Sequence, residues 1–153
     1  MSNNKLIIKV MSGVPNLEVM NDIGGCLVTK QFYKWDSNDE ICDLDENDYN
    51  SIITKAHNIK ITFPLGVNGI VSKVYNYNKE GPITLKIMIG IINNFYNRKI
   101  TKNEQKILEE QGELSEEQLA SFIKRLDLLK LTNNIFFQGV DLENDVYNIS
   151  LGS

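Results

Sequence analysis

The fold of this chain is decided by the stretch ITLKIMIGIINNFY, residues Ile83–Tyr96. Thr84 is a favourable N-cap, since its hydroxyl can accept a hydrogen bond from the first turn of a helix. Behind it, apolar residues recur at helical spacing: Leu85, Met88, Ile89, Ile92, Phe95 and Tyr96. Ile87 and Ile91 add a second apolar flank. The stretch therefore predicts a central helix that is covered on two sides.

Toward the C-terminus, two capping boxes predict two more helices. Thr101–Glu104 opens a short one, and Ser115–Gln118 opens a third that ends near Thr132. The residues expected to face inward on the third helix are Leu119, Phe122, Ile123 and Leu126. Two strands, Ile135–Val140 and Val146–Leu151, then flank an acidic tip. This order predicts a three-helix unit closed by a β-hairpin.

Toward the N-terminus, the pattern changes to strands. Asn58–Leu65 alternates apolar and polar residues with a period of two, and Ile70–Tyr77 follows an Asn-Gly pair favoured in tight turns. We also expect strands at Leu6–Met11 and Cys26–Trp35, and a short helix within Asp45–Ala56.

These segments together predict one α+β domain over residues 1–153. An antiparallel β portion, residues 5–78, packs on a helical portion, residues 82–153, which ends in the C-terminal hairpin.

Composition excludes several classes of protein. Hydrophobic residues make up 42% and charged residues 24%, as in ordinary soluble domains, and no apolar run is long enough to cross a membrane. The net charge of −4 argues against a surface devoted to a phosphate backbone. Cys26 and Cys42 are not spaced as a CxxC motif, and no signal-peptide pattern precedes them. We expect reduced structural thiols in an intracellular protein.

The sequence contains no recognisable catalytic motif. His57 is the only histidine, so neither a catalytic triad nor a multi-histidine metal site can be built. Within the acidic run that starts at Asp36, Asp43–Asn47 imitates the start of an EF-hand loop, but Asp48 stands where that loop needs glycine and Thr54 where it needs glutamate. We therefore expect a solvated acidic loop and no enzyme activity, catalytic residue, cofactor or metal.

The segment Phe32–Trp35 is the densest group of aromatic residues. Phe32, Tyr33 and Trp35 fit a stacking platform for a base or an anchor for a protein partner. A strand whose alternate aromatic side chains fill the core explains the same pattern. Both interpretations stay open at this stage.

A second candidate surface is basic. Arg98, Lys99, Lys102 and Lys106 cluster near the start of the second helix, and three helices with a hairpin are compatible with a winged-helix nucleic-acid binder. Over residues 98–130, seven acidic residues match seven basic ones, and the expected hairpin tip is acidic as well. We therefore rank nucleic-acid binding second.

Several motifs resemble a poorly characterised family of proteins from giant DNA viruses of the mimivirus kind. The matching segments are Thr62–Leu65, Pro82–Thr84 leading into Ile91–Tyr96, Phe137–Val140 and Asp145–Ser153. The resemblance covers about the last two-thirds of the chain, and the first 57 residues have no counterpart. It implies a viral protein without assigned catalytic residues.

The functional expectation is a non-enzymatic protein that binds another protein, as a viral accessory or virion factor in the host cytoplasm or the virion. Its expected contact surface combines the aromatic segment Phe32–Trp35 with the acidic loop, residues 36–48.

Overall fold

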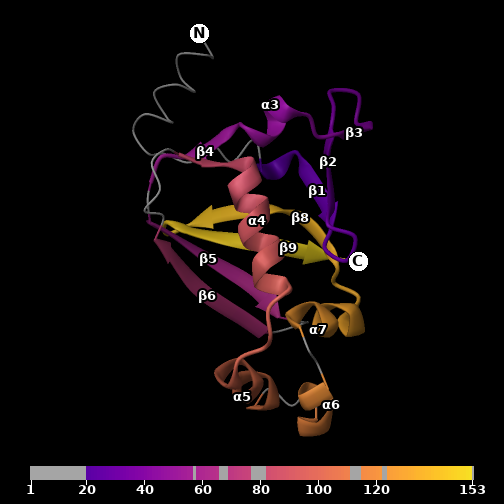
Figure 1. Cartoon of the computed structure of the whole chain (residues 1–153), viewed down its shortest axis with the longest axis vertical. Helices are drawn as coiled ribbons and strands as arrows, with labels where there is room; N and C mark the ends of the chain where they lie inside the picture. The colour runs from indigo at the N-terminus through magenta and orange to yellow at the C-terminus, as the bar shows by residue number, and fades with distance from the viewer. Residues whose placement is uncertain are drawn as a thin grey trace.

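The computed structural model describes residues 20–56, 58–65, 69–76, 82–110, 115–121 and 124–152. Within them, one sheet has the strand order β3-β2-β1-β8-β9-β5-β6, and helix α4 runs across one of its faces (Figure 1). The α+β fold predicted from the sequence is confirmed.

The strands are β1 (Ile23–Cys26), β2 (Gln31–Trp35), β3 (Ile41–Asp43), β4 (Ile52–Thr54), β5 (Asn58–Leu65), β6 (Gly69–Asn76), β7 (Ile83–Thr84), β8 (Phe136–Glu143) and β9 (Val146–Gly152). The helices are α3 (Glu46–Tyr49), α4 (Leu85–Tyr96), α5 (Lys102–Glu110), α6 (Glu116–Ser121) and α7 (Arg125–Thr132). Strands β4 and β7 pair with each other in a separate, two-stranded sheet.

The large sheet joins segments that are far apart in the sequence. The C-terminal hairpin β8–β9 lies between β1 and β5, so it is an internal part of the sheet (Figure 1). Strands β5 and β9 run parallel, with Lys60 opposite Val146, whereas the other pairings among the described strands are antiparallel. The β portion and the C-terminal hairpin therefore share one hydrophobic core.

The tip of the C-terminal hairpin is shorter than the sequence suggested. We expected a loop over residues 141–145, but β8 continues to Glu143 and only Asn144 and Asp145 form the turn. Both have positive φ angles, 53° and 63°. Asn and Asp tolerate this left-handed conformation better than most residues, which permits a two-residue turn.

Helix α4 packs on the sheet through the face that its sequence predicted. The Thr84 hydroxyl accepts a hydrogen bond from the Ile87 amide at 3.4 Å, which confirms the N-cap. The buried residues are Leu85, Met88, Ile89, Ile91, Ile92, Phe95 and Tyr96. The Phe95 ring stacks on Phe63 of β5 at 3.9 Å between centroids, and the Tyr96 hydroxyl donates to the Pro64 carbonyl. These contacts fix the end of α4 against β5.

Both predicted capping boxes are present. The Glu104 amide donates to the Thr101 hydroxyl at 3.2 Å, and the Gln118 amide donates to the Ser115 hydroxyl at the same distance. In each case the side chain of the third helical residue accepts a bond from the capping residue's own amide.

The predicted third helix is wrong as a single element, because it is divided into α6 and α7. Lys124 has an extended backbone between them, and its amide donates to the Asp127 carboxylate at 2.8 Å, which starts the second helix anew. Leu126 is buried as expected, whereas Phe122, Ile123 and the side chain of Leu119 lie outside what the structure describes.

A buried ion pair connects these helices to α4. The Arg125 guanidinium donates to both carboxylate oxygens of Glu104, at 2.8 and 2.9 Å. It also donates to the Phe95 carbonyl at 2.8 Å and lies 3.9 Å from the centre of the Phe95 ring. Arg125 therefore ties the C-terminal end of α4 to α5 and α7.

Two expectations in the first half need correction. Cys26–Trp35 is not one strand: Leu27–Lys30 turn the chain, and β1 pairs back on β2 as a hairpin. The helix expected within Asp45–Ala56 is limited to α3, because the β-branched residues that follow it form β4 instead and pair with β7. The expected strand at Leu6–Met11 and the turn around Asn68 lie outside the described residues.

Candidate functional site

The three aromatic residues of β2 point to opposite faces of the sheet. Phe32 lies on the face that α4 covers, is 8% exposed, and packs against Phe137 of β8 at 5.9 Å between ring centroids. Gly25 is the cross-strand partner of both. A Cβ at Gly25 would lie 2.5 Å from the Phe32 ring, so the missing side chain leaves the space in which this ring lies. Phe32 is therefore a core residue.

Tyr33 and Trp35 lie on the opposite face, which we call the outer face. Their rings meet edge to face at 5.2 Å, and both lie close over Gly24 of β1. Because glycine has no side chain, the two rings can pack directly against the backbone of Gly24, as aromatic residues do in cross-strand aromatic–glycine pairs. Trp35 is nevertheless 39% exposed. Of the three predicted binding residues, the structure thus exposes Trp35, leaves Tyr33 half-buried beside it, and buries Phe32.

Ile41 extends this surface, although the sequence analysis did not single it out. It is the cross-strand partner of Trp35, so both side chains lie on the outer face, and it is 64% exposed. Tyr33, Trp35 and Ile41 together form what we call the edge patch. The sequence Ile41-Cys42-Asp43-Leu44 has no period-two alternation, so no local signal identified Ile41.

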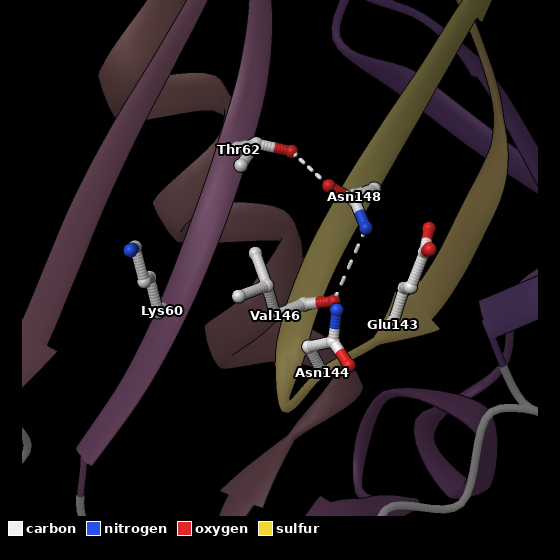
Figure 2. A pocket seen from close by; sticks show the side chains of 6 residues that line it. All are labelled: Lys60, Thr62, Glu143, Asn144, Val146 and Asn148. Atoms are coloured by element: carbon white, nitrogen blue, oxygen red, sulfur yellow. Dashed lines mark hydrogen bonds between the residues drawn. The ribbon is translucent and has the colours of Figure 1, made fainter.

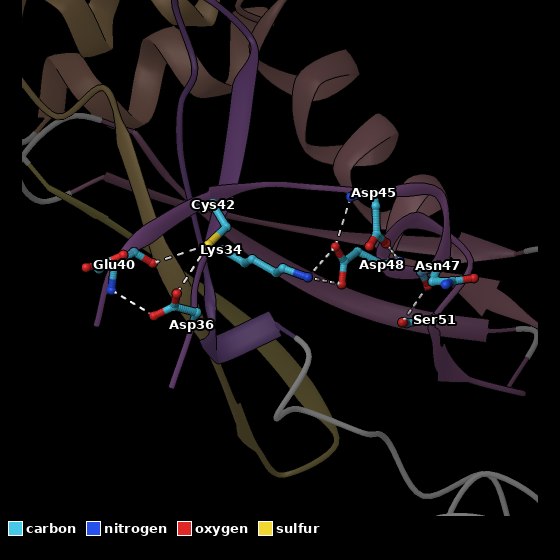
Figure 3. Close-up of polar contacts among 8 residues, drawn as sticks. All are labelled: Lys34, Asp36, Glu40, Cys42, Asp45, Asn47, Asp48 and Ser51. Carbon is cyan, nitrogen blue, oxygen red and sulfur yellow. Dashed lines mark hydrogen bonds and ion pairs between the residues drawn. The ribbon is translucent and has the colours of Figure 1, made fainter. Parts of the chain in front are cut away.

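The turn between β2 and β3 is held by one carboxylate. Asp36 Oδ1 accepts a hydrogen bond from the Asn38 amide at 2.8 Å. It accepts another from the Glu40 amide at 3.0 Å (Figure 3). The Cys42 thiol donates to Asp36 Oδ2 at 3.5 Å. The amide bonds from Glu40 and Asn38 lower the pKa of Asp36, which keeps this carboxylate ionised. The turn therefore presents the edge patch in a defined orientation.

A salt bridge connects β2 to α3 on the other side of the sheet from Trp35. Lys34 Nζ lies 2.7 Å from Asp48 Oδ2 and 3.0 Å from Oδ1 (Figure 3). Burial alone would raise the pKa of Asp48, but the bonds from Lys34 and from the Asp45 amide outweigh it and lower that pKa. The bond to Asp48 correspondingly raises the pKa of Lys34. Lys34 is thus already paired within the chain.

The residues that border the edge patch are acidic and exposed: Asp39, Glu40 and Asp43. Asp39 has a φ of 58°, which fixes the turn in a left-handed conformation. Among the residues that the structure describes, no cluster of three or more potential metal ligands forms. Cys26 and Cys42 are both free thiols. The acidic loop therefore acts as a negatively charged border.

The predicted basic residues occupy a different end of the molecule. Arg98 and Lys99 lie in the connection between α4 and α5, and Lys102 and Lys106 lie on α5. All four are exposed. Glu109 and Glu110 are exposed on the last turn of the same helix, so cations and anions alternate along it.

The outer face also carries a shallow polar hollow of about 260 Å³ between β5 and the tip of β8–β9 (Figure 2). Thr62 donates to the Asn148 side chain at 2.5 Å in its wall, and Lys60 and Glu143 stand on either side. The hollow is lined by one basic residue, Lys60, one acidic residue, Glu143, and the side-chain amides of Asn144 and Asn148. These residues do not form a nucleophile with an adjacent base, as covalent catalysis would need. Its chemistry suits weak polar contacts.

Comparison with known proteins adds no identity. No family model matches the chain, and neither the curated proteins nor the solved structures contain a match. In the described part of the chain, no helix is long and apolar enough to cross a membrane. The resemblance to giant-virus proteins stays a prediction.

Proposed function

We propose that this protein binds another protein through the edge patch and has no enzymatic activity. The observation that supports this most strongly is the pair of exposed apolar side chains, Trp35 and Ile41, side by side on the outer face. Exposed tryptophan beside aliphatic surface, bordered by charge, is typical of protein-interaction hot spots. The resemblance favours a viral accessory or virion factor, with the partner met in the host cytoplasm or the virion.

The seating of Trp35 supports a binding role over a purely structural one. Phe32 fills the core from the same strand, so the core does not require a second large aromatic residue at Trp35. The ring instead rests on Gly24 and Tyr33, which limits its freedom before any partner arrives. An anchor that is already ordered loses less conformational entropy on binding.

The test is the double variant Trp35→Thr with Ile41→Thr. Partners recovered with the full chain from cells are purified, and their dissociation constants are measured for both forms. We expect binding to weaken roughly thirtyfold or more, since truncating a hot-spot residue costs about 2 kcal/mol or more. The melting temperature should change little because both side chains are exposed.

Leu131→Thr is the matched control. Leu131 is an apolar residue of α7 that is 54% exposed but lies away from the edge patch. Equal weakening by Leu131→Thr and the double variant, or no weakening by either, would contradict the proposal.

Nucleic-acid binding is the second candidate, and the exposure of Arg98, Lys99, Lys102 and Lys106 on one short segment supports it. The test measures anisotropy of labelled duplex DNA and single-stranded RNA against salt. If this candidate is right, affinity falls steeply with salt, and Arg98→Glu, Lys99→Glu and Lys102→Glu together abolish it. Absence of binding at low salt rejects the candidate without affecting the edge patch.

A further inference from the structure

Strand β3 ends the large sheet, and its backbone groups alternate between β2 and the free side. The Asp36 amide donates to the Glu40 carbonyl at 2.9 Å, which places these two residues at a hydrogen-bonded pair position, although the Glu40 amide donates to Asp36 Oδ1. In an antiparallel ladder such pairs recur every second residue, which makes Lys34 and Cys42 the next one. Ile41 and Asp43 therefore turn their amides and carbonyls away from β2.

An independent bond confirms this alternation. The Trp35 amide donates to the Asp22 carbonyl at 3.1 Å, on the β1 side of β2. Because the Trp35 amide points toward β1, Trp35 and its cross-strand partner Ile41 occupy a non-hydrogen-bonded position of the ladder. No other strand in the described part of the chain pairs with β3. The backbone groups of Ile41 and Asp43 thus form an open edge.

The side chains of this edge are distinct on its two faces. Ile41 and Asp43 lie on the outer face, next to Trp35 and Tyr33 respectively, because these are their cross-strand partners. Cys42 lies on the other face, beside Lys34. A strand added along β3 would therefore meet an apolar site at Trp35–Ile41 and an acidic site at Asp43, two residues apart.

The negative charge along β3 indicates which kind of strand can pair with this edge. Asp39, Glu40 and Asp43 are exposed, and Lys34, the cation of β2, is held by Asp48 (Figure 3). Pairing of β3 with β3 of a second copy would bring like charges together, which is unfavourable. Acidic edge residues thus oppose self-association while attracting a strand that carries Lys or Arg.

We propose that β3 accepts an extended, basic segment of a partner protein as an additional strand of the sheet, with an apolar residue beside Ile41 and a Lys or Arg two positions away beside Asp43. This inference rests on the proposed function, since it assigns the partner's chemistry at the edge patch. Backbone hydrogen bonds to Ile41 and Asp43 give affinity, and the two side-chain sites give specificity.

The test begins with random ten-residue peptides displayed on phage and selected against the full chain. We expect the selected sequences to carry apolar and basic residues at a spacing of two. Fluorescently labelled synthetic copies are titrated against the protein and their anisotropy reports binding, since Trp35 is the only tryptophan in the chain and its own emission is lost in Trp35→Thr. Affinity should fall as salt is raised.

N-methylation distinguishes strand addition from side-chain docking alone. Methylating the peptide amides one at a time should weaken binding about tenfold at alternate residues and little at those between, because only alternate amides face β3. This arm uses the unaltered protein, so it does not depend on whether any variant folds.

A pair of variants tests the same point from the other side. Ile41→Ala removes the side chain and keeps the amide, whereas Ile41→Pro also removes the outward amide. We expect Ile41→Pro to bind about tenfold more weakly than Ile41→Ala, the loss of roughly one hydrogen bond. Circular dichroism is used to check that the two Ile41 variants are folded.

The outcomes separate this inference from the proposed function. Peptides that tolerate every N-methyl group but lose binding in Trp35→Thr would overturn strand addition and leave the edge patch as the interaction surface. Selection of no peptide, or of acidic peptides, would also overturn strand addition. Peptides indifferent to Trp35→Thr would count against both.

Discussion

The Glu104–Arg125 pair and the edge patch are opposite exceptions to the usual pattern of burial: charged side chains are buried at the first, and apolar side chains are exposed at the second. At the pair, charged side chains are only 4% exposed, yet Arg125 reaches both Glu104 oxygens and the Phe95 carbonyl. At the edge patch, apolar side chains are exposed although a well-packed core lies on the other face of the same strand. The buried charges are compensated within the chain, whereas no residue that the structure describes covers the exposed apolar side chains.

This difference separates a structural role from a binding role. A buried charge whose hydrogen-bond partners all lie within the protein stabilises the fold and needs no contact with another molecule. Exposed apolar surface without an internal partner remains available to another molecule. Variants in the two regions should therefore divide between stability and binding.

The largest expected effect is on the buried pair. Glu104→Ala leaves the Arg125 guanidinium buried without its carboxylate, and breaking such a pair costs about 3–5 kcal/mol of unfolding free energy. Denaturant unfolding measures it. The control is Glu104→Leu with Arg125→Met, which replaces the pair by apolar residues and should cost far less than Glu104→Ala. A single variant as stable as the parent would show that the pair is not needed.

The next prediction compares Gly24 and Gly25, the two neighbouring glycines of β1, which face opposite sides of the sheet. At Gly25, an added Cβ meets the Phe32 ring at 2.5 Å in the core, so Gly25→Ala should destabilise by about 1–3 kcal/mol. At Gly24, an added Cβ meets the outer edge of the exposed Trp35 ring at 2.6 Å. That ring can move, so Gly24→Ala should cost less and should instead shift Trp35 fluorescence.

The opposite order of stabilities for Gly24→Ala and Gly25→Ala would contradict the contrast between the core and the edge patch. A larger loss of stability in Gly24→Ala than in Gly25→Ala would mean that Trp35 contributes to the fold as much as Phe32 does. The thermal midpoint and the emission maximum of each variant decide the matter.

A smaller effect concerns acid stability beside the edge patch. The folded-state pKa of Asp48 is lowered, so its pairing with Lys34 contributes stability above the unfolded pKa, near 3.8. That contribution is lost as the pH falls through the still lower folded pKa. Lys34→Met should flatten this part of the stability profile below about pH 4 while leaving Ile41 exposed. An unchanged profile would show that the salt bridge does not contribute to stability.

The sequence predicted local structure well and long-range pairing poorly. Thr84, the two capping boxes and the alternation of Asn58–Leu65 act through near neighbours, and the structure has them as expected. The parallel pairing of β5 with β9 joins residues more than eighty positions apart. No local pattern encodes it, which is why the hairpin was expected to close the helical unit.

The candidate site shows the same limit. Composition marked Phe32, Tyr33 and Trp35 as a group, but only the strand's two-residue period and its orientation separate the core ring of Phe32 from the two rings on the outer face. Ile41 belongs to the patch solely because β3 pairs back on β2 with Ile41 opposite Trp35. The register of a hairpin decides such neighbours, and the length of its turn was not evident from the sequence.

The smallest expected effect is at Gly90 in α4, and it tests whether exposed surface away from the edge patch is free of partners. An added Cβ there meets nothing within 4 Å, and glycine is unfavourable in a helix interior. Gly90→Ala should therefore stabilise the protein by about 0.5–1 kcal/mol. Thermal and denaturant unfolding measure the gain, and binding of the partner should not change. If the variant gains stability but loses the partner, then a second contact surface lies over α4, and the contrast between the edge patch and the rest of the surface fails.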